Sequence, residues 1–131
     1  MIQRANEFQS KEGSAMEDVQ LTVIAEIKAK SGCEAALKQE LLKLVAPTHQ
    51  EEGCLDYDLH ESLERAGEFV FYENWTSREA LEEHLESAHL KAFRTVSGEL
   101  LREPVKIALY QRIAAKKGLP GGGLPLKVRD A

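Results

Sequence analysis

The segment EFVFYENWTSRE, residues 68–79, decides the fold expected for this chain. Its first eight residues alternate between two faces, which is the period of a β-strand. One face carries Phe69, Phe71 and Trp75, and the other carries Val70, Tyr72 and Asn74. A strand that is apolar on both faces is typical of a covered, central strand. The next four residues match a capping box with Thr76 as the N-cap and Glu79 at the third position, so a helix is expected to follow directly.

Alternating segments on both sides of this strand predict three more strands. Residues 19–30, 53–60 and 105–110 each alternate apolar and polar side chains. In the second of these segments, the apolar face is expected to carry Leu55, Tyr57 and Leu59. The polar face of the same segment carries Asp56, Asp58 and His60.

Helical spacing of apolar residues fills the intervals between the strands. The first helix is expected from Leu37 to Ala46, because Pro47 should end or kink it there. The second helical region falls into two pieces. Their apolar positions are Leu81 and Leu85 in the first piece, and Phe93, Val96, Leu100 and Leu101 in the second.

The resulting order is β-α-β-β-α-β, which predicts a ferredoxin-like α+β fold with a four-stranded antiparallel sheet and helices on one face. The opposite face would then expose an apolar surface made of Ile24, Val70, Tyr72, Ala108 and Tyr110. An exposed apolar surface of that size usually marks an interface. We therefore expect a homodimer in which two sheets pack face to face.

Composition sets the outer limits of the chain and of its partners. We expect one domain at residues 18–114, between a flexible extension at 1–17 and a Gly/Pro-rich tail at 115–131. A net charge of -5 disfavours nucleic acid as a partner. No apolar run approaches the roughly 18 residues needed to cross a membrane, and the first residues lack the apolar region of a signal peptide. These features, with only two cysteines, favour a cytoplasmic location.

Spaced residues in and after the central strand resemble the antibiotic biosynthesis monooxygenase (ABM) family, and its quinol monooxygenase-like members in particular. The resemblance rests on the segment FVFYENW at 69–75, followed by Ser77, Ala80, Leu81, His84, Ser87, His89 and Phe93. The segment EGCLxYxL at 52–59 is similar to the family's entry into its second strand. The resemblance covers about residues 19–113. It implies a dimeric α+β barrel that oxidises quinols or phenolic polyketides with O2 and uses no metal, flavin or haem cofactor.

Two histidines are the candidate catalytic residues. His84 should lie at the flank of the buried stripe of its helix, facing the gap between helix and sheet. Its imidazole could accept a proton from a phenol, because its ordinary pKa is about 6.5. His89 lies five residues on, roughly 140° around a continuous helix, so the pair is expected to be badly placed to hold one metal ion. We expect His89 to mark the junction of the two helical pieces, and no metal site.

Aromatic residues of the central strand are the candidate substrate-binding residues. Trp75, Phe69 and Phe71 would form either ordinary core or a flat apolar wall for an aromatic substrate. Asn74 could hydrogen-bond a substrate oxygen if the end of the strand is twisted or bulged. Tyr72 is expected on the opposite face, towards the dimer interface.

The leading hypothesis is a cofactor-independent monooxygenase that acts on a quinol-like or phenolic small molecule. Two alternatives remain open at the level of the sequence. One is a non-catalytic dimeric module that binds a small hydrophobic ligand. The other is a small-molecule isomerase that moves a proton through His84 and His89.

Overall fold

The computed structural model describes residues 19–114. Strands and helices follow one another in the predicted order, and the second helical region is divided as expected. The elements are β1 (Leu21–Lys28), α3 (Glu34–His49), β2 (Cys54–Glu61), β3 (Glu68–Trp75), α4 (Arg78–Leu85), α5 (Ala88–Ser97) and β4 (Lys106–Tyr110).

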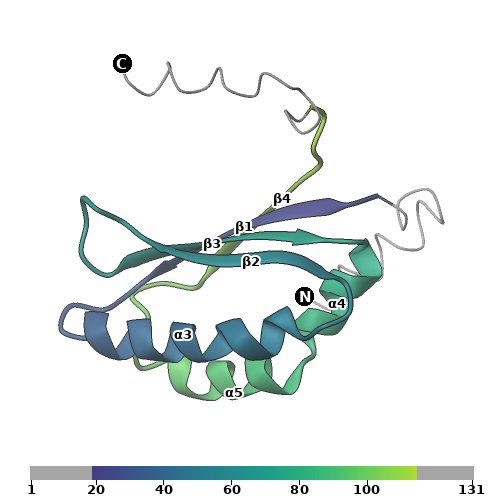
Figure 1. Cartoon of the computed structure of the whole chain (residues 1–131). Helices are drawn as coiled ribbons and strands as arrows, with labels where there is room; N and C mark the ends of the chain where they lie inside the picture. Colours follow the sequence, from purple (N-terminus) through teal and green to yellow (C-terminus); the bar gives the residue numbers. More distant parts are fainter. Residues whose placement is uncertain (1–18, 115–131) are drawn as a thin grey trace.

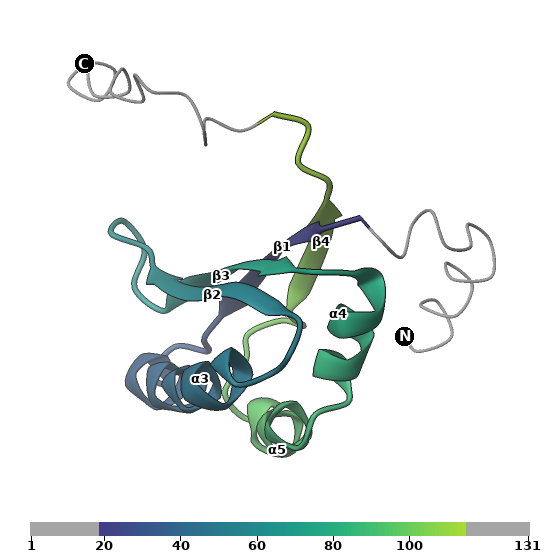
Figure 2. The ribbon, with the colours of Figure 1, turned by 45° about the vertical axis from the view of Figure 1, so that its right-hand side comes forward.

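The four strands form one antiparallel sheet in the order β2-β3-β1-β4. The strand β3, which was predicted to be central, is therefore internal to the sheet, with β1 on one side and β2 on the other. All three helices lie on the same face of the sheet (Figure 1), and a view turned by 45° shows α3, α4 and α5 beneath the strands (Figure 2). This arrangement confirms the predicted ferredoxin-like α+β fold.

The core lies between the sheet and the helices. The inward residues of β1 alternate with exposed or half-buried ones, as the period-two pattern requires. The buried apolar residues contributed by the strands are Leu21, Val23, Ala25, Ile27, Tyr57, Phe69, Phe71 and Trp75, and the helices add Leu37, Leu41, Leu44, Leu81 and Phe93. The aromatic side chains of β3 that were predicted to share a face all belong to this core.

The helix α3 continues past the position where the sequence predicted its end. It includes Pro47 and runs to His49, and Thr48 is fully buried. Proline lacks an N–H, but so near a helix end this removes only one intrahelical hydrogen bond. The helix therefore passes through Pro47 to the buried Thr48, and the prediction of an end at Ala46 was wrong.

The strand β2 departs from regular alternation near its start. The register shifts between Cys54 and Asp56, so Leu55 leaves the inward face and is 49% exposed. A bulge of this kind adds one unpaired residue to a strand. The expectation that Leu55 faces inward was therefore wrong, whereas Tyr57 is buried in the core as expected.

The cap of α4 lies one residue later than predicted. Ser77, and not Thr76, is the N-cap, and its hydroxyl accepts a hydrogen bond from the Ala80 N–H at 3.1 Å. Both residues are good cap formers, so the local pattern does not separate them. The strand β3 continues to Trp75, and the extended backbone of Ser77 (φ -162°) places its hydroxyl over the first turn of the helix.

The helices do not cover the whole sheet. The edge strand β4 is exposed along its length, and its inward residues Ile107 and Leu109 are 50% and 40% exposed. Val96, one of the apolar positions of the second helical piece, is also exposed. The apolar pattern of this part of the sequence therefore overstated how far the core extends.

The expected extension at 1–17 and the tail at 115–131 lie outside the described residues. Within residues 19–114, no helix combines the length and the apolar character needed to span a membrane.

The sheet face opposite the helices is exposed within the described part of the chain. Tyr72 and Tyr110, both on this face, are at least one-third exposed. We propose that two copies of the chain pack these faces together, since large exposed apolar surfaces are uncommon on monomers.

Replacing Tyr72 with Glu should convert such a dimer into a monomer, because a charge would be buried in the apolar interface. Light scattering after gel filtration measures the change. Leu63→Glu, at a loop residue that is 101% exposed, should leave the mass unchanged. A monomeric wild-type chain at micromolar concentration would contradict the prediction.

Gly53 is a point of close contact between the start of β2 and α4. A Cβ at this position would clash with the Cβ of Ala80 and would lie 2.8 Å from the Thr76 Oγ1. Gly53→Ala should therefore destabilise the fold by about 1–3 kcal/mol, the usual cost of overpacking. Gly98→Ala is the matched control, because nothing lies within 4 Å of its Cβ position, and it should be neutral. Urea unfolding compares the two; equal stabilities would refute the proposed clash.

Candidate functional site

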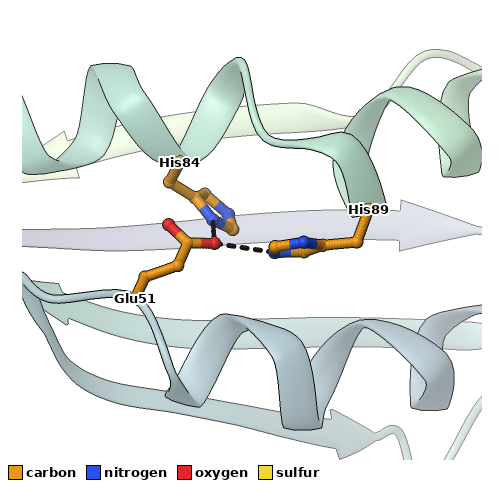
Figure 3. Close-up of side chains that lie close together, drawn as sticks. All are labelled: Glu51, His84 and His89. Carbon is orange, nitrogen blue, oxygen red and sulfur yellow. Dashed lines mark hydrogen bonds and ion pairs between the residues drawn. The ribbon is translucent and has the colours of Figure 1, made fainter.

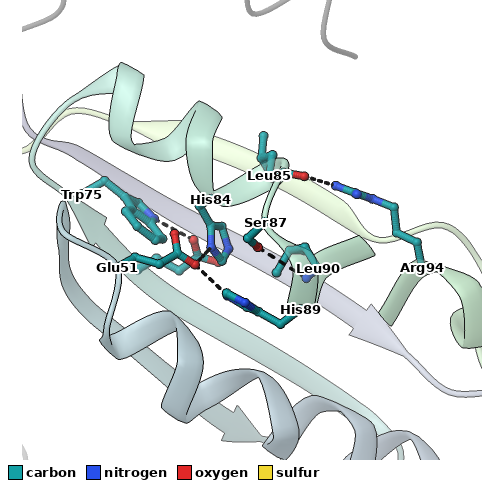
Figure 4. Close-up of polar contacts among 9 residues, drawn as sticks. Glu51, Trp75, His84, Leu85, Ser87, His89, Leu90 and Arg94 are labelled. Atoms are coloured by element: carbon teal, nitrogen blue, oxygen red, sulfur yellow. Dashed lines mark hydrogen bonds and ion pairs between the residues drawn. The ribbon is translucent and has the colours of Figure 1, made fainter. Parts of the chain in front are cut away.

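The break between α4 and α5 positions the two candidate histidines. The helix α4 ends at Leu85, and Ser87 is the N-cap of α5, where its hydroxyl accepts a hydrogen bond from the Leu90 N–H at 3.4 Å. From within α5, the Arg94 guanidinium donates to the Leu85 carbonyl oxygen at 2.5 Å (Figure 4). A cation at the end of a helix satisfies a free carbonyl group and fits the helix dipole. These two contacts fix the angle between the helices.

His84 and His89 converge on one carboxylate across this break. The Oε2 atom of Glu51 lies 3.0 Å from Nδ1 of His84 and 2.7 Å from Nε2 of His89 (Figure 3). Glu51 comes from the turn that follows α3, so three separate segments meet here. His89 lies in the first turn of α5, as predicted for a residue at the junction. The expectation that the pair is badly placed to hold one metal ion assumed a continuous helix; the break between α4 and α5 instead brings both imidazoles to one oxygen atom.

Burial makes His84 the more unusual of the two histidines. It is 2% exposed, and its burial lowers the pKa of the imidazole, while the hydrogen bond and charge of Glu51 oppose this change. The lowered pKa favours a neutral ring at neutral pH. A neutral ring that donates from Nδ1 to Glu51 carries its lone pair on Nε2. His84 therefore has the properties of an oriented base.

Aromatic rings surround the His84 imidazole. Its centroid lies 4.5 Å from that of Trp75 and 5.3 Å from that of Tyr57, and the Tyr57 ring is in turn stacked on Phe71 at 4.3 Å. Trp75 thus lies directly against His84, and Phe71 belongs to the same cluster through Tyr57. Phe69 is a buried core residue near the start of β3. Tyr57, which the sequence suggested only as core, is a direct neighbour of the base.

A second buried carboxylate lies beside this cluster and was not predicted as a site residue. Glu73 is 4% exposed, and its Oε1 accepts a hydrogen bond from the Trp75 indole Nε1 at 2.8 Å. Burial raises the pKa of Glu73 to about 7, the Trp75 hydrogen bond opposes the rise, and the charge of Glu51 adds to it. Burial and the charge of Glu73 also raise the pKa of Tyr57 far above its ordinary value.

Two of the predicted substrate-binding residues lie away from the histidines. Asn74 is on the open face of the sheet, where its side chain accepts a hydrogen bond from the Thr22 hydroxyl at 2.5 Å and donates to Asp56 at 2.9 Å. Its amide is thus already engaged by neighbouring strands. Tyr72 lies on the same open face, as expected.

The two cysteines are free and only partly buried. Burial, followed by the charge of Glu51, raises the pKa of Cys54 to about 11. Such a thiol is a poor nucleophile at neutral pH.

A small cavity reaches the cluster from the side of His89. It has a volume of about 110 Å³ and is lined by Glu40, Lys43, Leu44, His89, Ala92 and Phe93. Cavities that hold drug-sized ligands are usually about 300–1,000 Å³. A drug-sized substrate that approaches by this route must therefore displace part of the cavity wall, which α3 and α5 form together.

The strand order, the divided second helix and the imidazole–carboxylate cluster define a small ferredoxin-like protein with reactive groups held between the sheet and its helices. The family model described as antibiotic biosynthesis monooxygenase matches residues 20–96. The chain belongs to this family.

Several relatives carry names that specify the family's activity further. "Putative monooxygenase Rv0793" from Mycobacterium tuberculosis is 39% identical over 89 residues, which cover 68% of this chain and 87% of that protein. "Probable quinol monooxygenase YgiN" from Escherichia coli is 33% identical over 98 residues, covering 66% of this chain and 94% of that protein. Among solved structures, PA3566 from Pseudomonas aeruginosa is 41% identical, with a TM-score of 0.71 over 73% of this chain and 96% of its own. The similarity thus spans the described fold.

Glu73 should make the stability of the protein depend on pH. The folded state keeps the carboxyl protonated up to about pH 7, whereas the unfolded chain releases this proton near 4.5. Stability is therefore fully present below the lower value and declines as the pH rises towards the upper one. Glu73→Gln should abolish this decline, which we expect to be about 1–3 kcal/mol.

Urea unfolding of both proteins across this pH interval measures the effect. Glu79→Gln, at an exposed position of α4, serves as the control and should keep the wild-type pH dependence. Parallel pH profiles for wild type and Glu73→Gln would show that Glu73 does not hold its proton in the folded state.

Proposed function

We propose that the protein is a cofactor-independent monooxygenase that oxidises a quinol-like or phenolic small molecule with O2. The observation that carries the proposal is the hydrogen bond between the buried His84 and the partly buried Glu51. The family and the names of its relatives support the reaction class, and the pair supplies the group that this chemistry needs.

The Glu51 carboxylate orients the His84 imidazole. The Glu51 carboxylate accepts a hydrogen bond from Nδ1 of His84, with 3.0 Å between Nδ1 and Oε2. This leaves Nε2 to accept a proton from a substrate hydroxyl. The same carboxylate stabilises the imidazolium that then forms, as a buried acid does for the histidine of a catalytic triad. Rings of Trp75 and Tyr57 pack around the imidazole and keep water from it.

The reaction that follows uses the substrate's own electrons. Loss of the hydroxyl proton gives a phenolate, which transfers an electron to O2, and the two radicals combine to form a carbon–oxygen bond. For a phenol with a free ring position, one oxygen atom enters the ring and the other leaves as water, so that phenol and O2 give quinone and water. His84 returns its proton to the oxygen that leaves. We keep the expectation that no cofactor takes part.

Two features would bring the substrate to this base. The aromatic side chains of the cluster provide flat apolar contacts for a ring, and the cavity beside His89 gives an approach. Arg94 holds the junction between α4 and α5 and is therefore a positioning residue, because it keeps His84 and His89 on the same carboxylate.

Replacing His84 with Ala should reduce oxygen uptake by well over tenfold, since a general base contributes about 10²–10⁴. Glu51→Gln should also reduce it by at least about tenfold, because the amide cannot stabilise the imidazolium as a carboxylate does. The assay measures O2 consumed by metal-stripped protein with a panel of hydroquinones and phenolic polyketides, corrected for autoxidation.

His60→Ala is the matched control for these variants. His60 is exposed on β2, where Nδ1 lies 3.2 Å from the Asp58 carbonyl oxygen, and its loss should leave the rate unchanged. Full activity in a folded His84→Ala protein would remove the proposed base from the mechanism. Oxygen uptake that never exceeds the blanks would refute the monooxygenase proposal.

The isomerase alternative has one specific observation in its favour. Glu51 joins His84 and His89 through a single oxygen atom, which is an arrangement suited to passing protons between two bases. Product formation without oxygen uptake would support the isomerase. Saturable ligand binding without any turnover would instead support the non-catalytic module.

A further inference from the structure

The cluster of Glu51, His84 and His89 contains the donor atoms of a metal site. One carboxylate oxygen and two imidazole nitrogens, one from each residue, all lie within 4.8 Å of one another. They come from the turn after α3, the last turn of α4 and the first turn of α5. We propose that this triad binds a divalent transition-metal ion of the zinc type, and that the bound ion blocks the base function of His84.

The distances within the triad are close to those between the ligands of one ion. Zinc binds imidazole nitrogen and carboxylate oxygen at about 2.0–2.2 Å, so two adjacent ligands lie roughly 3 Å apart. The carboxylate oxygen of Glu51 is 3.0 Å and 2.7 Å from the two nitrogens. The two nitrogens lie within 4.8 Å of each other, so the side chains must rotate to bring all three atoms to bonding distance of one ion.

The donor set selects the class of cation. Two imidazoles and one carboxylate suit zinc and its neighbours in the first transition row, whereas Mg²⁺ and Ca²⁺ prefer oxygen ligands alone. The carboxylate of Glu51 is the acidic ligand of the set, which favours a cation. Three protein ligands also leave room for a water molecule, as in open zinc sites.

An ion can reach the triad from the side of His89. This residue is the most exposed of the three by a small margin, with 20% of its side chain accessible, and it lines the cavity of about 110 Å³. Lys43 at the same cavity is paired with Glu40 at 2.9 Å, so its charge is partly compensated. Water molecules that complete the coordination would occupy this space.

Binding of the ion would change the tautomer of His84. In the absence of metal, the ring donates from Nδ1 and keeps its lone pair on Nε2. A metal bound at Nδ1 requires the single ring proton to move to Nε2, because a neutral imidazole carries only one N–H. Nε2 then cannot accept a proton from a substrate, so the ion and the reaction exclude one another. This second half of the proposal rests on the proposed function, whereas metal binding itself does not.

Calorimetry with Zn²⁺ on the metal-stripped full chain tests the binding. We expect one ion per protomer and no comparable binding of Mg²⁺. His89→Ala and Glu51→Gln should each weaken Zn²⁺ binding at least tenfold, and His60→Ala should not change it. No binding, or equal binding by all variants, would overturn the proposed site.

A measurement on the unaltered chain removes dependence on how the variants fold. Long-range ¹H–¹⁵N NMR spectra distinguish the two tautomers of a histidine ring, and addition of Zn²⁺ should move the His84 proton from Nδ1 to Nε2. An unchanged tautomer under saturating Zn²⁺ would exclude His84 as a ligand through Nδ1.

Oxygen uptake separates the two halves of the proposal. Uptake by the metal-stripped protein that Zn²⁺ suppresses, and that a chelator restores, supports the block of His84. Uptake that Zn²⁺ leaves unchanged or increases would overturn the block, even if the ion binds. If the metal-stripped protein shows no uptake with any substrate, the proposed function fails, and calorimetry and NMR still decide whether the site exists.

Discussion

The packing of Trp75 against the His84 ring joins the sheet to α4 at the candidate site. The indole is completely buried at the end of β3, and its N–H is satisfied by Glu73 on the same strand. One face of the aromatic cluster thus belongs to the sheet and the other to α4. This contact places His84 at a fixed height above the sheet, where the carboxylate of Glu51 can reach it. Apolar burial, which is non-directional, brings the layers together, and the hydrogen bonds then determine their register.

Removing a carboxylate from water costs free energy, and Glu51 and Glu73 lie at different depths in the core. Glu51 remains at the border of the core, where two imidazoles and solvent share its charge. Glu73 lies deeper, and its raised pKa means that protonation relieves part of the cost of burial. The two carboxylates therefore lie in different environments, Glu73 buried near Tyr57 and Glu51 at the border of the core beside His84. Active sites that divide acid and base roles between like residues use the same physical means.

The sequence predicted most of the fold, because its patterns are local. Alternation over eight residues identified β3 with its observed bounds, and the division of the second helix was visible in the spacing of its apolar residues. The errors occurred where a tertiary contact overrides a local rule. The helix α3 passes through Pro47 to the buried Thr48, Leu55 turns outward at a bulge, and Ser77 replaces Thr76 as the cap.

The site was less predictable for a related reason. His84 and His89 were suggested by residue type and resemblance, but their partner Glu51 is 33 residues away in sequence from the first and 38 from the second. No periodic pattern connects positions so far apart, and a glutamate in a polar turn has no distinguishing feature. Glu73 was missed for another reason, because a charged residue within an apolar strand is usually expected to be exposed to solvent.

The antiparallel pairing of the first and last strands has a consequence for the connectivity of the domain. Thr22 lies opposite Tyr110, so the polypeptide enters and leaves the sheet at neighbouring positions. The four strands and three helices therefore form an almost closed circuit. The packing of these elements does not depend on the order in which the chain forms them. A circularly permuted chain, joined between the start of β1 and the end of β4 and opened at the turn near Glu64, would have the same arrangement. The contacts between the strands and helices define this fold, and the order of the elements along the chain does not.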